Sequence, residues 1–273
     1  MSGSIGGNRI NREDVLNTVI SYEEVVLKKF PGYKKCVITG SYNAGIKKDH
    51  GDIDLVVYIE GEDITSIKKK FKQYLDDLSD DITIPFKSGK RMGEKSQLFG
   101  QIVTCGYNIY SKSQYVQVDN IIVDSLEKLE FQNNFLNLSA PKQALLMGLV
   151  RVLGGREFIE EYKSNNEFEY EFVLSPQGIS FRELLMENFK ELKRNVLWKS
   201  YNWSVLSELL PTINIEDDYE EILSSVSEYL DERSKRRIVG LIKSVINIGV
   251  GEVGTQKGRD KENAIKLAES ILG

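Results

Sequence analysis

The sequence predicts an α/β (α+β) chain with two domains, one that mixes strands with helices and one that is mostly helical. Two observations predict this. Helical and strand-like segments interleave as far as about residue 123, which is typical of a sheet flanked by helices. From residue 137 to the end, helical periodicity dominates and strand-like alternation is scarce. We therefore expect domains at 1–136 and 137–273.

The first domain is predicted element by element from its periodicity. Asn11 is expected to be the N-cap of a helix that Pro31-Gly32 ends. A second helix is expected near residues 64–78. Runs rich in β-branched residues predict the strands, which are expected at 35–39, 52–59, 82–86, 102–110 and 115–123.

The second domain is expected to begin with a helix opened by Ser139-Ala140-Pro141 and ended by Gly154-Gly155. Ser180 and Glu183 have the spacing of a capping box, which predicts another helix through Val196. The glycine-rich segment GEVGTQKGRDKEN is expected to be a mobile loop that ends at an Asp260 N-cap. Further helices are predicted at about 203–210, 219–231, 234–248 and 260–272.

Composition narrows the function classes. The chain is 41% hydrophobic and 28% charged, as in ordinary globular proteins. No apolar run has the length of a membrane span, so we expect no membrane partner and a cytoplasmic protein. Cys36 and Cys105 are expected to be reduced and buried. A net charge of −5 argues against non-specific coating of nucleic acid, although it allows a short strand in a local basic groove.

The segment TGSYNAGIKKDHGDIDLVVYI carries the most informative pattern. Asp52 and Asp54 are separated by one residue on a predicted strand, so both carboxylates lie on the same face. Two like charges held side by side repel each other, and such pairs usually persist because a cation lies between them. Gly40-Ser41 offers a tight turn with free backbone N–H groups and a hydroxyl, which suits a phosphate. The pattern predicts a site for a metal-bound nucleotide triphosphate.

The Gly-Ser turn followed by Asp-x-Asp resembles the signature of the DNA polymerase beta-like nucleotidyltransferase superfamily. That signature requires a third carboxylate on a neighbouring strand, and Asp119 in YVQVDNIIV is the best candidate. The resemblance covers roughly residues 12–125. It implies that the first domain is a nucleotidyltransferase catalytic core with a mixed β-sheet flanked by helices, and that the helical domain closes the substrate cleft.

The resemblance also implies a chemistry for these residues. Asp52, Asp54 and Asp119 would bind two Mg²⁺ ions about 3.5–4 Å apart, with Mn²⁺ as the alternative metal. Asp119 would serve the acceptor side and help to take the proton of the attacking hydroxyl. Gly40 and Ser41 would hold the β- and γ-phosphates of an NTP substrate. The expected activity is an EC 2.7.7-type transfer of NMP to an acceptor hydroxyl with release of pyrophosphate.

Several cations are secondary candidates. Lys142 would close over the triphosphate from the helical domain, and its alternative role is a solvated cation. Lys90 and Arg91 form a basic loop in KSGKRMGEKS that could reach the acceptor. Lys257 and Arg259 could clamp an anionic acceptor from the glycine-rich segment. Basic residues in such loops are equally consistent with a solvated surface.

Two further residues adjoin the motif. His50, the single histidine, is expected to be an exposed loop residue, with a substrate contact as the minor alternative. Asp49 lies outside the register of the carboxylate pair.

The acceptor is open at the level of sequence. The first hypothesis is an RNA 3′ end extended without a template. The alternatives are a small hydroxylated molecule such as an aminoglycoside, a protein or tRNA modified by a toxin, and an inactive nucleotide-binding module. A basic, elongated groove would favour RNA, whereas a compact acidic pocket would favour a small cationic molecule. The oligomeric state is not predicted.

Overall fold

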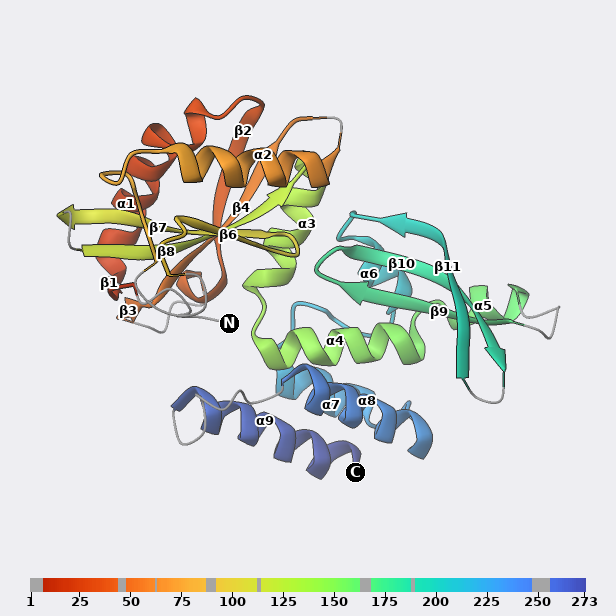
Figure 1. Cartoon of the computed structure of the whole chain (residues 1–273). Coiled ribbons are helices and arrows are strands. Elements are labelled where there is room, and N and C mark those ends of the chain that lie inside the picture. The colour runs from red at the N-terminus through yellow and green to blue at the C-terminus, as the bar shows by residue number, and fades with distance from the viewer. Residues whose placement is uncertain are drawn as a thin grey trace. The chain divides into compact units, whose positions relative to one another are not determined.

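The chain divides into two compact units in a computed structural model, unit 1 at Met1–Asn137 and unit 2 at Leu138–Gly273 (Figure 1). The structure describes residues 7–43, 48–61, 63–86, 92–111, 114–162, 168–187, 190–246 and 256–273. Unit 1 combines a sheet with helices, and unit 2 is built from helices and a smaller sheet. The α+β class predicted from the sequence is confirmed.

Unit 1 is built on a six-stranded mixed sheet in the order β2-β4-β8-β7-β5, with β6 paired to β7. The pair β4–β8 is parallel, and the other pairs are antiparallel. β4 and β8 are central strands rich in valine and isoleucine, as expected for strands buried on both faces. The strands are β2 (Tyr33–Thr39), β4 (Asp52–Ile59), β5 (Thr83–Ile84), β6 (Ser96–Phe99), β7 (Ile102–Ser111) and β8 (Gln114–Val123).

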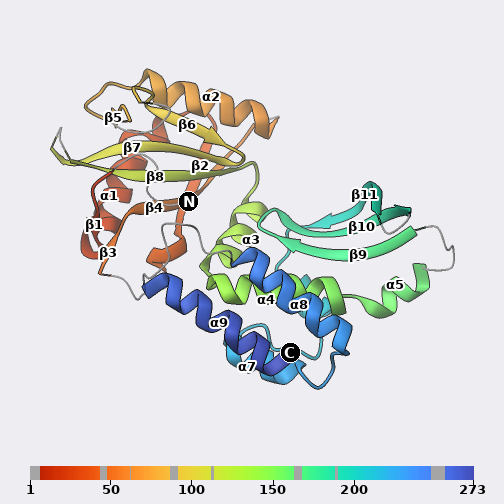
Figure 2. The same ribbon diagram turned by 60° about the horizontal axis from the view of Figure 1, so that its bottom comes forward.

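Helices cover both faces of this sheet (Figures 1 and 2). Because side chains alternate along a strand, Leu55 and Val57 of β4 pack among residues of α1 (Arg12–Val25) and α2 (Ile64–Asp77). Val56 points the opposite way and packs in a cluster with Leu129 of α3 (Leu126–Asn137). A short 3₁₀ turn, η1 (Leu27–Lys29), follows α1. The mixed sheet flanked by helices matches the prediction.

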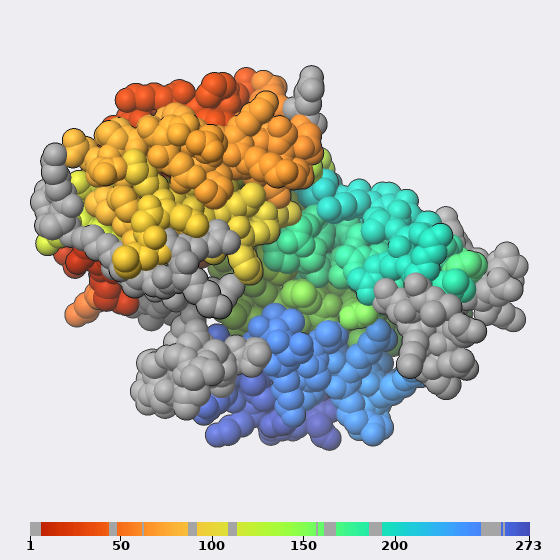
Figure 3. All heavy atoms as spheres, in the orientation of Figure 1, coloured from red at the N-terminus to blue at the C-terminus, as the bar shows by residue number. Residues whose placement is uncertain are grey.

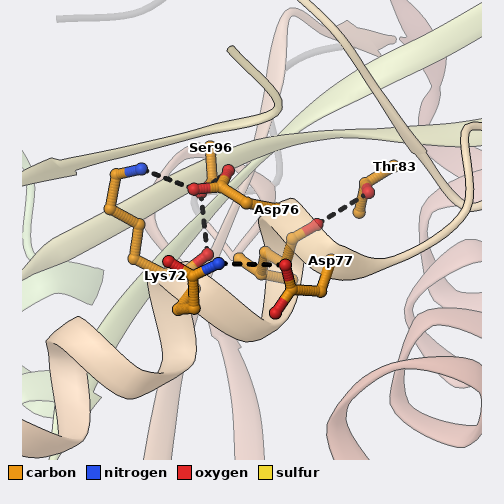
Figure 4. A network of polar contacts seen from close by, with 7 residues as sticks. Lys72, Asp76, Asp77, Thr83 and Ser96 are labelled. Atoms are coloured by element: carbon orange, nitrogen blue, oxygen red, sulfur yellow. Dashed lines mark hydrogen bonds and ion pairs between the residues drawn. The ribbon is translucent and has the colours of Figure 1, made fainter.

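Polar contacts attach the end of α2 to the neighbouring strands (Figure 4). Lys72 Nζ and Ser96 Oγ both donate to the Asp76 carboxylate, at 2.6 and 2.5 Å. Thr83 Oγ1 donates to the carbonyl of Leu75 at 2.9 Å. The Ser96 and Thr83 bonds fix α2 to β6 and β5, whereas the Lys72 bond lies within the helix. Figure 3 shows the side chains of α2 in orange, spread over the outside of unit 1.

Unit 2 contains a three-stranded antiparallel sheet in the order β11-β10-β9. β11 is an edge strand, and it carries three exposed apolar side chains, Val196, Leu197 and Trp198. Glu171 of β9 is buried and accepts bonds from Arg151 at 2.6 and 3.3 Å. The strands are β9 (Phe168–Ser175), β10 (Gly178–Glu187) and β11 (Lys190–Ser200), and the helices are α4 (Ala140–Leu153), α5 (Arg156–Tyr162), α6 (Val205–Leu209), α7 (Tyr219–Val226), α8 (Glu232–Val245) and α9 (Gln256–Leu272).

The helix predicted to start at Ser180 and run through Val196 is wrong, because these residues lie in strands β10 and β11 and in the segment that joins them. The register between the two strands shifts at Phe181/Arg182 and again at Leu185/Met186. Each irregularity changes the phase of the inside–outside alternation, so the apolar residues lose their period of two. Strand pairing then overrides the helical propensity of the Glu- and Leu-rich segment.

The loop predicted to end at an Asp260 N-cap is also corrected in part. Residues 247–255 lie outside the described chain, but α9 already begins at Gln256, so Asp260 lies inside a helix. Among the described residues, no helix is both long and apolar enough to cross a membrane.

Candidate active site

Three carboxylates come together where β4 begins. The parallel pairing of β4 with β8 places Asp54 beside Asp119 and Asp52 beside Gln117. These four side chains share one face, because the residues alternate in both strands. Each of Asp52, Asp54 and Asp119 offers a carboxylate oxygen within 4.8 Å of the others. Clustered carboxylate oxygens of this kind fit the preference of Mg²⁺ for oxygen ligands.

Asp119 is the buried member of this group, with 8% of its surface exposed. Its Oδ1 accepts hydrogen bonds from Thr104 Oγ1 at 2.7 Å and from Gln117 Nε2 at 3.0 Å, and its Oδ2 accepts from Gln117 Nε2 at 3.0 Å. Burial raises the pKa of Asp119, the two hydrogen-bond donors oppose that rise, and the Asp52 charge adds to it. Thr104 and Gln117 therefore fix the orientation of the Asp119 carboxylate, whose negative charge is unfavourable in this buried position.

Gly40 opens the turn η2 (Gly40–Tyr42) directly after β2. Its φ is +70°, in the left-handed region that favours glycine. A Cβ at this position would lie 2.5 Å from Asp54 Oδ2. The glycine is required for two reasons, its backbone conformation and the close approach of the turn to the second carboxylate.

The end of α3 holds the same turn in place. Asn137 Oδ1 accepts hydrogen bonds from Thr39 Oγ1 at 3.0 Å and from Asn43 Nδ2 at 2.9 Å. Asn43 Nδ2 also donates to the carbonyl of Ile38 at 2.8 Å. Residues on both sides of Gly40-Ser41 are thus anchored to a helix that packs on the sheet. This anchoring limits how far the turn can move when it binds a ligand.

Ser41 Oγ lies 3.1 Å from His50 Nδ1, which corrects the expectation that His50 is an exposed loop residue. The histidine is buried, with 1% of its surface exposed, and it belongs to the short strand β3 (Asp49–His50). Its ring also lies 5.7 Å from that of Tyr42, centroid to centroid. The Arg12 guanidinium lies 4.5 Å over the Tyr42 ring and donates to the Tyr42 carbonyl at 2.6 Å.

The secondary cations lie either outside the described residues or in unit 2. Lys90 and Arg91 lie outside the described residues. Lys257 and Arg259 belong to α9 of unit 2 rather than to a loop, and their side chains are not described. Lys142 lies in the first turn of α4, and its Nζ donates to the carbonyl of Glu216 at 3.3 Å. Their roles toward a nucleotide or an acceptor stay predictions.

Sequence reasoning missed the residues that support the carboxylates. Thr104 has no motif of its own, and only the pairing of β7 with β8 brings it beside Asp119. Gln117 lies two residues before Asp119 on β8. Asn137 reaches the turn from a helix that ends about a hundred residues later in the chain. For Gln117, one signal was available, because residues i and i−2 of a strand share a face.

A cavity of about 770 Å³ also lies in unit 1, lined by residues such as Phe30, Glu60, Lys70 and Tyr74. It lies beside the end of β4, whereas Asp52 begins that strand. Seven residue steps at about 3.3 Å each separate the two ends by roughly 23 Å. This cavity is therefore distinct from the carboxylate site.

No known family model matches the chain, and no curated protein matches it. Similar solved structures include Leishmania infantum polymerase beta in a ternary P/T complex, with 13% identity and a TM-score of 0.40, covering 64% of this chain and 58% of that one. A second is the Cid1 poly(U) polymerase with Mg 3′-dATP bound, with 11% identity and a TM-score of 0.32, covering 82% of this chain and 71% of that one. The chain thus spans less than two thirds of the polymerase beta chain.

Proposed function

We propose that this chain is a nucleotidyltransferase that moves an NMP from an NTP to an acceptor hydroxyl and releases pyrophosphate. One observation carries the proposal: three carboxylates converge within 4.8 Å, and a left-handed Gly-Ser turn approaches the second of them. A cluster of like charges at a strand end is unfavourable by itself, which points to a cation as its normal partner. The adjacent turn offers backbone N–H groups for phosphate oxygens.

The residues present fit a pair of Mg²⁺ ions. Asp52 and Asp54 are half-buried and Asp119 is buried, so the cluster can face both a ligand and the core. Asp52 and Asp54 would share both ions, and Asp119 would hold the one on the acceptor side. When bound, the ions supply charge neutralisation for the triphosphate and the attacking oxygen.

The side chains of this chain then have separate tasks. Ser41 Oγ and the backbone of the turn bind the β- and γ-phosphates, and the contact with His50 Nδ1 orients the hydroxyl. Asp119 Oδ2 has one hydrogen-bond donor, whereas Oδ1 has two, so Oδ2 is the oxygen better suited to accept the acceptor's proton. The acceptor oxygen bonds to the α-phosphorus as the bond to the bridging oxygen breaks, and pyrophosphate leaves.

We take an RNA 3′ end as the acceptor, extended without a template. The support is the set of basic candidates outside the carboxylate site, namely Lys90 and Arg91 in unit 1 and Lys257 and Arg259 in unit 2. Under this proposal unit 1 is the catalytic domain, and unit 2 closes over the substrates with Lys142 toward the triphosphate. Local cations of this kind can bind a short strand even in an acidic protein.

The test is a transfer assay with each α-³²P-labelled NTP, Mg²⁺ or Mn²⁺, and total RNA. Wild type is compared with Asp54→Asn and with Asp77→Asn, a control whose carboxylate accepts a bond from Gln73 on the outer helix α2. Label in RNA that is lost in Asp54→Asn and kept in Asp77→Asn supports the proposal. Label found in a small molecule, a protein or tRNA would identify that molecule as the acceptor in place of an RNA 3′ end. Binding of NTP without transfer to any of these would contradict enzymatic function.

A further inference from the structure

Residues 7–12 form a strap, here called the N-terminal strap, that begins on β8. The Asn8 N–H donates to the Tyr115 carbonyl at 2.7 Å, and Asn8 Oδ1 accepts from the Tyr115 N–H at 3.3 Å. A Cβ on Gly7 would lie 3.1 Å from the backbone nitrogen of Gln117. β4 pairs with β8 only from Gln117 onward, so the strap takes the place beside β8 that β4 leaves open.

The other end of the strap pairs with the segment before β4. Within it, β1 (Ile10–Asn11) is antiparallel to β3, with Ile10 opposite His50. The Arg12 N–H then donates to the Lys48 carbonyl at 2.9 Å. A chain that is bonded to β8 at residue 8 and to β3 at residue 10 runs from one strand to the other near the start of β4. Residue 9 lies between these two contacts.

That residue is Arg9, and its guanidinium is held by a two-point contact. Its Nε donates to Asp49 Oδ2 and its Nη2 to Asp49 Oδ1, both at 2.8 Å. Asp49 is thereby neutralised and does not add to the carboxylate cluster. The pair raises the pKa of Arg9 and lowers that of Asp49, and the Asp52 charge raises the Arg9 pKa further. Arg9 is thus electrostatically coupled to the first carboxylate of the site.

The third nitrogen, Nη1, lies over the residue that precedes Asp52. It is 3.7 Å from the position that a Cβ on Gly51 would occupy. The Arg9 side chain is 60% exposed, so a ligand at the start of β4 can reach this nitrogen. Guanidinium groups bind phosphate oxygens with directional N–H donors, and a group already fixed by a carboxylate loses little freedom on binding.

We infer that Arg9 binds the polyphosphate of the nucleotide through Nη1, with Asp49 as the residue that positions it. This inference rests on the proposed function and adds a cation from a segment that the sequence motif does not include. The cation lies beside Asp52, while the Gly40-Ser41 turn lies beside Asp54. A polyphosphate bound at this site would thus meet the Arg9 cation near Asp52 and the N–H donors of the turn near Asp54.

The probe is inorganic tripolyphosphate, measured by calorimetry in the presence of Mg²⁺ and as an inhibitor of NMP transfer. Arg9→Gln should weaken tripolyphosphate about tenfold, a loss of ~1.4 kcal/mol, while inhibition by the NMP is unchanged. Asp49→Asn should give a smaller loss in the same direction. Arg236→Gln, on the exposed face of α8, is the matched control and should change neither tripolyphosphate binding nor inhibition by the NMP.

Arg9→Lys keeps the positive charge but removes the guanidinium geometry, so it separates these two contributions to binding. Thermal melting of each variant checks that the strap still folds. Unchanged tripolyphosphate binding in a folded Arg9→Gln variant would overturn the inference while leaving the proposed transfer intact. An equal weakening of tripolyphosphate and NMP binding would also overturn the inference. That result would indicate that Arg9 supports the structure of the site and does not bind the polyphosphate. If wild type transfers no NMP while Arg9→Gln still weakens tripolyphosphate binding, the proposed function is contradicted and the role of Arg9 in polyphosphate binding is supported.

Discussion

At the scale of single residues, Gly40 and Asp54 depend on each other. The turn can approach the carboxylate only because no Cβ stands between them. Gly40→Ala would add a methyl group 2.5 Å from Asp54 Oδ2 and strain a backbone with φ of +70°. We expect the rate of NMP transfer to fall by about 10²-fold or more, because displacements near 1 Å at a reacting site have costs of that size.

The control for this prediction is Gly240→Ala. Gly240 lies in the middle of α8, and a Cβ there would meet no atom within 4 Å. Alanine favours a helix over glycine by up to ~1 kcal/mol, so this variant should be as stable as wild type or more stable. Steady-state kinetics of Gly40→Ala and Gly240→Ala measure the rates of NMP transfer, and circular dichroism checks that both variants fold. Wild-type activity in Gly40→Ala would refute the assigned role of the turn.

Asp119 leads to a prediction about stability without metal. Its pKa is raised in the folded chain, so the ionised form is penalised by folding above the usual aspartate pKa. Asp119→Asn removes this penalty, and Gln117 can rotate its amide to present Oε1 to the new NH₂ group. We expect the metal-free variant to melt a few degrees higher than wild type at pH 7, since ~1 kcal/mol corresponds to about 2–4 °C.

The sign of the pH dependence follows. As the pH falls through the raised pKa toward the usual value near 3.9, wild-type Asp119 takes up a proton and its penalty disappears. The stability advantage of Asp119→Asn should therefore be largest at neutral pH and shrink on acidification. Adding Mg²⁺ should stabilise wild type and have a smaller effect on the variant. Calorimetric melting curves at several pH values test this, and a variant less stable than wild type at pH 7 would contradict it.

At the scale of elements, helix caps offer a measurement that is independent of function. Asp218 caps α7 and accepts from the N–H groups of Glu220 and Glu221 at 2.9 and 3.0 Å, in a complete capping box. Asp218→Ala should lower the free energy of unfolding by ~1 kcal/mol. Ser204→Ala is the control in the same unit, because Ser204 precedes α6 without a side-chain cap bond. Equal losses in urea titrations of the two variants would argue against the cap.

Elements with a clear local signal were predictable from the sequence. β4 has the predicted bounds, Asp52–Ile59, because its apolar residues are continuous and glycine precedes it. α4 begins after Ser139, which accepts from the Lys142 N–H, and ends at Gly154 as expected. In both cases the residues that determine the element lie within it or at its ends, so the local sequence is enough to predict it.

Elements whose signal depends on partners were not predictable. The apolar residues of β11 follow no simple period, since this strand has an extra residue at each of its two register shifts against β10. The candidate active site also contains residues that the local sequence predicts and residues that it does not. Asp52, Asp54 and Gly40 belong to one short motif, whereas Thr104 supports Asp119 through a strand pairing that only the folded sheet defines. The position of His50 beside Ser41 likewise follows from the pairing of β1 with β3.

At the scale of the whole molecule, every residue of the carboxylate site belongs to unit 1. Its carboxylates come from the central strands of the sheet, its turn is anchored by α3, and the N-terminal strap pairs with β3 next to it. The scaffold of the site is therefore formed from segments spread over most of the first 137 residues. Unit 2 has its own sheet and helices.

The parallel pairing of β4 with β8 has a consequence for the order of folding. Asp54 and Asp119 meet in register although 65 positions separate them along the chain. Contacts of such sequence separation form late, because the entropy of the intervening loop must be lost first. The carboxylate cluster should thus be among the last features to form during refolding. In stopped-flow experiments, Mn²⁺ binding should lag behind helix formation seen by circular dichroism, and coincident phases would contradict this order.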